Sequence, residues 1–246
     1  MKQDKDFIFG IRAVIEAIKA GKQIDKLMIK SGLKGELFFE LIELVKELEM
    51  PVQYVPNERL NRVTMKNHQG VIAYISPIEF QNIENILPLL FETGKTPLFV
   101  ILDKVTDVRN FGAITRTAEC ANVNAIIVPE KGSAQISGDA VKTSAGALLK
   151  MPVCRVKNLS KTLTYLQESG IQIIAATEKA SDFYYKVDFS VPTAILLGSE
   201  DRGVDFEYLR GADQLVKIPI LGEIDSLNVS VAASILIYEA VKQRLS

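Results

Sequence analysis

The chain has 246 residues, of which 48% are hydrophobic and 24% charged, and its formal net charge is −1. This length can bury one large core or two small ones, and the composition is that of an ordinary globular protein. No apolar run is long enough for a transmembrane helix, and the first residues, MKQDKDFIFG, lack the apolar stretch of a signal peptide. We therefore expect a cytoplasmic protein with no membrane partner.

Metal chemistry is disfavoured because the chain has one histidine, His68, and two cysteines, Cys120 and Cys154. Most zinc sites need more ligands of these types. Both cysteines lie in apolar surroundings, which predicts two buried, reduced thiols. Basic residues outnumber acidic ones over 103–161, which gives weak support to a phosphate-bearing partner.

Residues 1–76 are expected to form a small α/β domain. Apolar positions recur at helical spacing over 10–20, and residues 35–49 form a strongly amphipathic helix. Short strands are expected at 26–30, 52–55 and 71–75, with a short helix near 57–65. Tyr54 and Tyr74 lie in two of these strands and are expected in the core.

Residues 77–96 are expected to be a linker, because they contain Pro77, Pro88 and Gly94, with a short helix, IENILPLLFE, inside the segment. A second α/β domain then covers 97–246, beginning with the all-apolar strand LFVIL, which is typical of a buried parallel strand. Further strands are expected at 124–128, 171–176 and 194–198, and a long helix over 228–244. This alternation predicts a parallel sheet covered on both faces.

Because ligands of open parallel sheets bind beyond the carboxyl ends of the strands, the segments after each strand are the candidate sites. The first, residues 102–128, carries Asp103, Asp107, Arg109 and Asn110 in a polar loop. A helix is expected to begin near Gly112, capped by Asn110, with Arg116 one turn in. A capped surface helix with a solvated arginine would give the same spacing.

The second segment is ILLGSEDRGVD, residues 195–205. Gly198 and Gly203 would let a ligand approach the backbone closely, or simply form a tight turn. No Lys-Ser or Lys-Thr follows Gly203, and the chain lacks a glycine-rich dinucleotide fingerprint, which excludes the common nucleotide sites. The third segment, 216–241, leads through Ile218, Ser226, Leu227 and Asn228 into the last helix.

Together, in this order and each after a strand, the three segments resemble the three motifs of the SpoU (TrmH) family of RNA 2′-O-ribose methyltransferases. The resemblance covers 98–246, and GIRAVIEAI and NHQGVIAYIS in the first domain look like the substrate-binding domain of the RlmB-like subgroup. It implies an α/β-knot (SPOUT) domain with a deep trefoil knot, after a smaller, ribosomal-protein-like α/β domain that binds RNA. It also implies S-adenosylmethionine as methyl donor and, for this subgroup, a guanosine in 23S ribosomal RNA as the target.

The resemblance assigns roles to matching positions. The cofactor-binding positions are Thr177, Gly198, Glu200, Ile218, Leu227 and Asn228. The catalytic positions are Asn110 and Arg116, supported by Glu200, Ser226 and Asn228. Because an arginine stays protonated in proteins, we expect Arg116 to anchor an RNA phosphate and stabilise negative charge on the reacting oxygen.

Arg12, Arg59, Arg62, Lys66 and Arg109 are candidate phosphate contacts, although each would also suit an ordinary surface. His68 and Gln69 either touch RNA or satisfy a turn. The family also implies a homodimer through the C-terminal domain, and small residues on the last helix (Ser230, Ala233, Ser234) are compatible with close packing there.

Two alternative functions stay open. One is transfer RNA as the substrate of the same reaction, which the extra N-terminal domain disfavours. The other is a non-catalytic RNA-binding assembly factor on this fold, which would not need Asn110, Arg116, Glu200 and Asn228 together.

Overall fold

The computed structural model describes residues 7–246 and divides into two compact units between Glu79 and Phe80. The first unit holds residues 7–79, and the second holds the remainder, except that residues 135–139 group with the first. The division falls inside the expected linker over 77–96, so residues 80–96 belong to the second unit.

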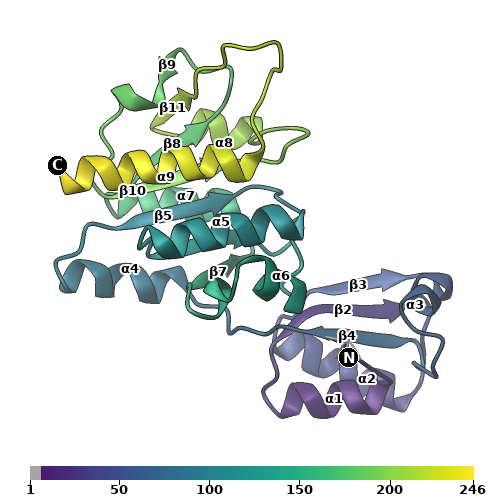
Figure 1. Ribbon diagram of the computed structural model, residues 1–246. Coiled ribbons are helices and arrows are strands. Elements are labelled where there is room, and N and C mark those ends of the chain that lie inside the picture. The colour runs from purple at the N-terminus through teal and green to yellow at the C-terminus, as the bar shows by residue number, and fades with distance from the viewer. Residues whose placement is uncertain (1–6) are drawn as a thin grey trace. The chain divides into compact units, whose positions relative to one another are not determined.

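The first unit is a four-stranded sheet in the order β1-β4-β2-β3 with three helices (Figure 1). Strands β1 and β2 run antiparallel to β4, and β3 runs parallel to β2. The predicted helices and strands are present; β1 was not predicted, because three residues are too few to show a periodic pattern. The elements are β1 (Phe7–Phe9), α1 (Ile11–Lys19), β2 (Ile24–Lys30), α2 (Glu36–Glu47), β3 (Val52–Val55), α3 (Asn57–Val63) and β4 (Val71–Ile75).

Alternate side chains of this sheet enter two separate small cores. Leu27 and Ile29 of β2 pack with α1 and α2, whereas Met28 between them packs with Leu60 of α3. This follows from the two-residue period of a strand. The expectation that Tyr54 is a core residue is wrong, since it is 57% exposed on β3, the edge strand of the sheet.

The second unit is a seven-stranded sheet in the order β7-β6-β5-β10-β8-β11-β9, in which every neighbouring pair is parallel. The chain runs outward from β5 through β6 to β7, then crosses over to β8, and β10 is inserted between β5 and β8. Such a reversal of strand order brings loops together at the carboxyl edge of the sheet. The strands are β5 (Leu98–Leu102), β6 (Ala125–Pro129), β7 (Val153–Val156), β8 (Gln172–Ala176), β9 (Asp182–Phe183), β10 (Thr193–Leu197) and β11 (Gln214–Lys217).

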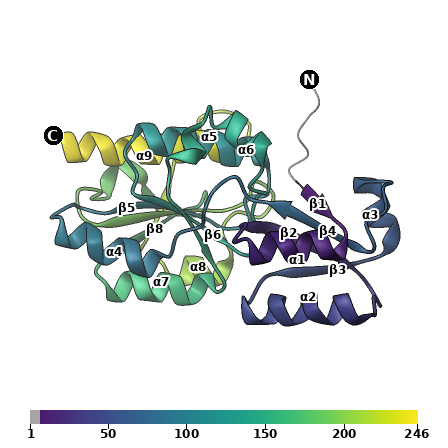
Figure 2. The same ribbon diagram turned by 90° about the horizontal axis from the view of Figure 1, so that it is seen from below.

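Helices cover both faces of this sheet, with α4, α7 and α8 on one side and α5, α6 and α9 on the other (Figure 2). Ile83 and Leu87 of α4 are buried against Phe99 and Ile101 of β5, so the helix expected inside the linker is packed into the core of the second unit. The helices are α4 (Ile83–Glu92), α5 (Val108–Cys120), α6 (Gly138–Thr143), α7 (Leu159–Glu168), α8 (Phe206–Gly211) and α9 (Val229–Leu245), with single 3₁₀ turns at Ala147–Leu149 and Tyr184–Lys186.

The two cysteines differ in environment. Cys154 of β7 is buried as expected, and this burial raises the pKa of its thiol to about 12. The same expectation is wrong for Cys120, which is exposed at the last position of α5. Over residues 7–246, no helix is both long and apolar enough to cross a membrane.

Candidate active site

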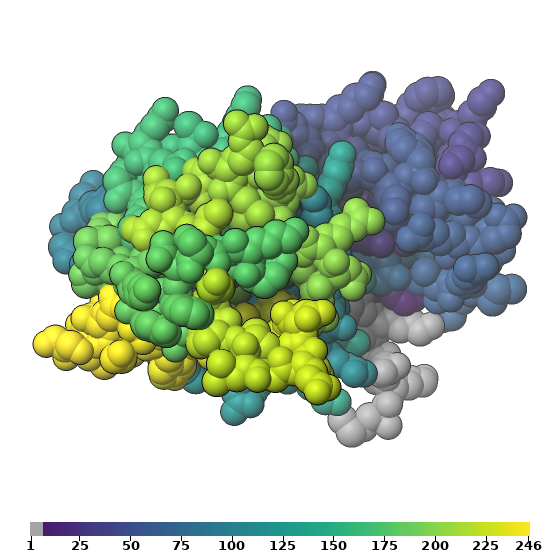
Figure 3. Space-filling view, turned by 90° about the horizontal axis from the view of Figure 1, so that it is seen from above, coloured from purple at the N-terminus to yellow at the C-terminus, as the bar shows by residue number. Residues whose placement is uncertain are grey.

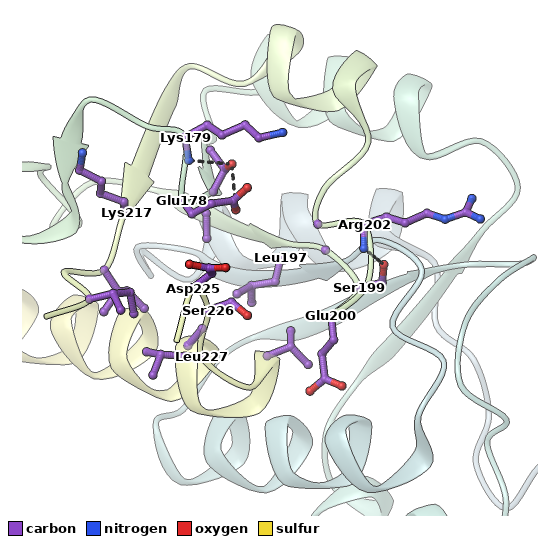
Figure 4. A pocket seen from close by; sticks show the side chains of 18 of the residues that line it. Glu178, Lys179, Leu197, Ser199, Glu200, Arg202, Lys217, Asp225, Ser226 and Leu227 are labelled. Carbon is purple, nitrogen blue, oxygen red and sulfur yellow. Dashed lines mark hydrogen bonds between the residues drawn. The ribbon is translucent and has the colours of Figure 1, made fainter. Parts of the chain in front are cut away.

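The loops that follow three neighbouring parallel strands, β8, β10 and β11, enclose a cavity of about 390 Å³ (Figure 4). Because these strands are parallel, their carboxyl ends meet at one edge of the sheet. The walls are formed by residues 176–179, 197–203, 216–218 and 225–227, together with Ile220, Val229 and Ala232.

The residues predicted to bind the cofactor meet at this cavity. Thr177, Gly198, Glu200, Ile218 and Leu227 line it, and so does Ser226 from the predicted catalytic set. Asn228 stands at the start of α9 directly after the lining residue Leu227 and reaches the cavity through a hydrogen bond to Glu200. The second and third sequence segments therefore come together in space at this cavity.

Asn110, Glu200 and Asn228 form a closed hydrogen-bonded network. Asn110 Nδ2 donates to Glu200 Oε1 at 3.0 Å, and Asn228 Nδ2 donates to Asn110 Oδ1 at 3.0 Å and also to Glu200 Oε1. The Asn228 Oδ1 atom accepts from the backbone N–H of Ser230, at 2.9 Å, and so caps α9. One carboxylate oxygen thus holds two amides, and hydrogen bonds to a charged acceptor are the stronger kind.

The capping of α5 differs from the prediction. Asp107, and not Asn110, is the N-cap: its carboxylate accepts from the backbone N–H groups of Arg109 and Asn110 at 2.7 and 2.9 Å. The helix consequently begins at Val108, one turn earlier than expected. Because Asp107 takes the capping role, the Asn110 side chain is released to join Glu200 and Asn228.

Arg116 is exposed on α5 and forms no hydrogen bond or ion pair with any other residue in the part of the chain that the structure describes. It does not line the cavity. It follows Asn110 by six positions, which on a helix turns its side chain to a different face. The structure brings Asn110, Glu200 and Asn228 together and leaves the Arg116 guanidinium open to solvent.

Gly198 is required by the loop itself. A Cβ atom there would overlap the backbone carbon of Gly203, because residues 199–203 fold back in a tight turn with Ser199 and Gly203 bridged. Gly203 has φ +66°, in the left-handed region that favours glycine. The spacing of these two glycines therefore reflects a turn that fixes Glu200 at the cavity.

A buried polar contact that the sequence did not predict joins the first and second motif loops. Asp103, at the end of β5, is 2% exposed, and its carboxylate accepts from the backbone N–H of Asp205 at 2.9 Å. Desolvation is the main cause that raises the pKa of Asp103. The neighbouring Lys104 forms an exposed ion pair with Asp205 at 2.8 Å. The only sequence feature that pointed to this contact was the polar loop that begins at Asp103.

The side chains predicted to contact RNA are all exposed. Four of them, Arg12, Arg59, Arg62 and Lys66, belong to the first unit, and Arg109 belongs to the second. Arg59 and Arg62 lie on α3, and Lys66 follows that helix. The Ile11 N–H at the start of α1 donates to Gln69 Oε1, so Arg12 lies at the same end of the sheet as the 64–70 segment.

His68 satisfies local structure. It is 7% exposed, its Nδ1 accepts from the backbone N–H of Gly70 at 3.0 Å, and its Nε2 donates to Asn61 Oδ1 at 2.9 Å. Of the two alternatives for His68, the turn is the one observed. Over residues 7–246, no cluster of His, Cys, Asp and Glu side chains could hold a metal ion.

A parallel α/β sheet with reversed strand order, and a cavity at its carboxyl edge lined by both apolar and charged side chains, are typical of a domain that binds a small cofactor. The sequence profile of the SpoU rRNA Methylase family matches residues 97–238, and that of RNA 2′-O ribose methyltransferase substrate binding matches residues 7–81. The chain belongs to the SpoU (TrmH) family of RNA 2′-O-ribose methyltransferases.

Relatives match along almost the whole chain. YacO of Bacillus subtilis (strain 168), named for the TrmH family of tRNA/rRNA methyltransferases, is 34% identical over 245 residues, or 99% of this chain and 98% of YacO. The AdoMet-bound rRNA methyltransferase of Sinorhizobium meliloti is 26% identical and superimposes with a TM-score of 0.63 over 98% of this chain and 88% of its own. The A. aeolicus TrmH/SpoU tRNA modifying enzyme is 33% identical, with a TM-score of 0.57, over 66% of this chain and 84% of its own.

The predicted family, the two-domain α/β fold and the class of reaction are confirmed by these matches. S-adenosylmethionine is the methyl donor of this family.

Proposed function

We propose that this chain methylates a ribose 2′-hydroxyl of a guanosine in 23S ribosomal RNA, with S-adenosylmethionine bound in the cavity. The observation that supports this most directly is the network in which Asn110 of the first motif meets Glu200 and Asn228, at the edge of a cavity built by the loops after β8, β10 and β11. Residues far apart in sequence are thereby held where a ligand in the cavity would meet an incoming nucleotide.

The cavity fits S-adenosylmethionine in size and chemistry. Its volume of about 390 Å³ lies within the range of small-molecule sites. Leu197, Ile218 and Leu227 supply apolar walls that suit a flat purine, and the backbone groups of Gly198, Ile218 and Leu227 would hold the adenine. Charges of both signs line the same cavity: the carboxylates of Glu178 and Asp225 would face the positive groups of the donor, and Lys179 and Lys217 its carboxylate.

When bound, S-adenosylmethionine supplies a methyl group on a positively charged sulfur. The ribose hydroxyl would accept this methyl group and release its proton to solvent, and the donor would be left as a neutral thioether. In this arrangement Glu200 fixes the amides of Asn110 and Asn228, and Asn110 has a second N–H free for the nucleotide. Ser226, on the cavity wall, supports them.

Arg116 would bind the RNA phosphate next to the reacting ribose. A guanidinium presents several donors in a fixed plane that matches a phosphate, and it is a poor base. Its exposure and lack of a partner among the described residues leave it available for this contact. Arg12, Arg59, Arg62, Lys66 and Arg109 would add phosphate contacts that position the RNA without reading its sequence.

Ribosomal RNA is favoured as the substrate by the extent of two structural matches. The structural match with the S. meliloti rRNA methyltransferase covers 98% of this chain, whereas the structural match with the A. aeolicus tRNA modifying enzyme covers 66%. The substrate-binding unit at residues 7–81 supports assignment to the RlmB-like subgroup. This substrate implies a cytoplasmic protein.

The deciding experiment is incubation of the pure protein with labelled S-adenosylmethionine and total RNA, followed by nuclease mapping. We expect label on one guanosine ribose of 23S RNA. If only transfer RNA were labelled, transfer RNA would be the substrate in place of 23S RNA. If no RNA were labelled although the protein is folded and binds the donor, the non-catalytic assembly factor would be favoured.

We also propose a homodimer through α9. Val231, Tyr238 and Leu245 are exposed and recur every seven residues, which places them along one face of the helix. The small residues expected to serve this contact pack within the chain: Ala233 is fully buried, and Ser234 Oγ lies 3.2 Å from Thr117 Oγ1 of α5. A monomer at micromolar concentration in size-exclusion chromatography with light scattering would contradict the dimer.

The deep trefoil knot is part of the same proposal. Its support is that the 198–203 and 218–228 segments, which follow β10 and β11, line one cavity and are linked by Glu200 and Asn228.

A further inference from the structure

A cluster of aromatic side chains lies outside the site described above, at the edge of the second unit's sheet. Phe183 and Tyr185 stack with their ring centroids 5.4 Å apart and an interplanar angle of 12°, and Tyr184 meets Tyr185 edge-on, also at 5.4 Å. Tyr185 is 50% exposed. Two neighbours in the same segment, Val187 and Phe189, are buried, so the segment has core positions and nevertheless presents the exposed Tyr185 ring beside the half-buried rings of Phe183 and Tyr184.

Two lysines accompany these rings. Lys217 Nζ lies 5.2 Å from the centre of the Phe183 ring, and Lys186 Nζ lies 6.0 Å from it. A cation over an aromatic face is attracted by the negative face of the ring, which holds both lysines close to the surface of the cluster. Two acidic residues, Asp182 and Asp188, are exposed nearby and accept hydrogen bonds from Ser181 and from Ser190, respectively.

The cluster continues the rim of the methyl-donor cavity. Strand β9, which carries Phe183, pairs with β11 in the register Lys217 opposite Phe183, and the next residue, Ile218, lines the cavity. Lys217 and Lys179 also line it, and Figure 4 shows both on the same side of the cavity. In Figure 3 the green segment after β8 and the yellow-green segment after β11 lie side by side on one face.

We propose that Phe183, Tyr184 and Tyr185, with Lys186 and Lys217, form a platform on which an unpaired base of the RNA substrate stacks beside the methylated nucleotide. Exposed rings accept any base, because every base has a π face, and adjacent lysines hold the phosphate backbone. This inference uses the family's RNA substrate and rests on the proposed position of the methyl donor in the cavity. RNA fits this surface because it supplies both stacking surfaces and negative charge for the two lysines.

The chain contains no tryptophan, so Tyr185→Trp gives a single fluorescent reporter in the cluster. We expect its emission to fall when a short single-stranded RNA of mixed sequence is added, and to stay constant with an abasic oligonucleotide of the same length. The matched control is Tyr165→Trp, on α7 outside the cavity walls, whose emission should not respond to either oligonucleotide.

Binding is read without methyl transfer, so this test can fail while the proposed function stands. Equal responses to both oligonucleotides, or none, would overturn the platform. Emission from the Tyr185→Trp variant that changes with protein concentration in the absence of RNA would show that the surface meets a second copy of the chain, and would overturn it too.

Two further variants decide the question if Tyr185→Trp does not fold. Tyr185→Ala should raise KM for RNA about 5- to 150-fold, the range expected for one stacked base, with kcat and affinity for S-adenosylmethionine unchanged. Tyr185→Phe keeps the ring and should restore KM. An unchanged KM in the alanine variant, or a fall in kcat alone, would refute base stacking.

Discussion

The side-chain amides of Asn110 and Asn228 are hydrogen-bonded at 3.0 Å, although the two residues stand 118 positions apart in the chain. Asn110 is in the first turn of α5, and Asn228 is the N-cap of α9. Glu200, in the loop after β10, accepts from both amides. One carboxylate therefore ties together the starts of two helices, so substitutions here can be chosen to separate chemistry from stability.

Glu200→Gln keeps the size of the side chain and removes its charge. We expect kcat to fall about 10- to 100-fold, because hydrogen bonds to a charged acceptor contribute about 1.5–3 kcal/mol each and the two amides would lose their orientation. Single-turnover methylation at saturating RNA and donor measures this. Glu207→Gln on α8 is the matched control: its carboxylate accepts from Ser160 and does not line the cavity. Equal rates in the two variants would remove Glu200 from the mechanism.

Asn228 combines two roles that different substitutions separate. Asn228→Ser should keep the cap of α9, because serine is a comparable N-cap, and should lose both amide donors. Asn228→Ala should lose the cap as well, at about 1 kcal/mol, which corresponds to a fall in Tm of roughly 2–4 °C. We expect low activity in both variants and a lower Tm only in the alanine variant. Full activity in Asn228→Ser would contradict the proposed network.

Arg116→Lys keeps the charge and removes the planar fork. We expect Tm to stay constant, since Arg116 has no partner among the described residues, and kcat/KM for RNA to fall about 10-fold or more through loss of a paired, charged hydrogen bond. Thermal melting and steady-state kinetics provide the two measurements. Near-full turnover of this variant would show that a second guanidinium hydrogen bond has no part in the reaction.

Individual helices and strands could be predicted from the sequence, whereas contacts between segments far apart in the chain could not. The amphipathic α2 and the apolar β5 follow from periodicity, and the site residues were found through resemblance to a family. The sequence did not predict that Asp107 would cap α5 in place of Asn110, because both residue types are good caps. The insertion of β10 between β5 and β8 and the contact of Asp103 with Asp205 depend on distant segments, which no local pattern records.

Gly198→Ala tests the loop that carries Glu200. The new methyl group would overlap the backbone of Gly203 and Val204, so the turn must shift. We expect a loss of about 1–3 kcal/mol in stability and a large loss of S-adenosylmethionine affinity, measured by denaturant unfolding and calorimetry. Gly211→Ala is the matched control, because a Cβ atom there meets nothing within 4 Å. Donor affinity equal to that of the unsubstituted protein would show that the turn does not shape the cavity.

Asp103→Asn tests how the stability contributed by Asp103 changes with pH. Burial raises the pKa of Asp103 above its ordinary value, so deprotonation opposes folding. The stability contributed by this residue is therefore fully present below its unfolded pKa and decreases as the pH rises through its folded pKa. Asparagine keeps an oxygen that can accept from the Asp205 N–H and does not titrate. We expect the unfolding free energy of the unsubstituted protein, minus that of the variant, to decrease from acidic pH toward neutrality and then stay constant. Denaturant titrations of both proteins across this pH range measure the difference in unfolding free energy. If that difference increased toward neutral pH, the Asp205 N–H and Lys104 would stabilise the charged carboxylate more than burial opposes it.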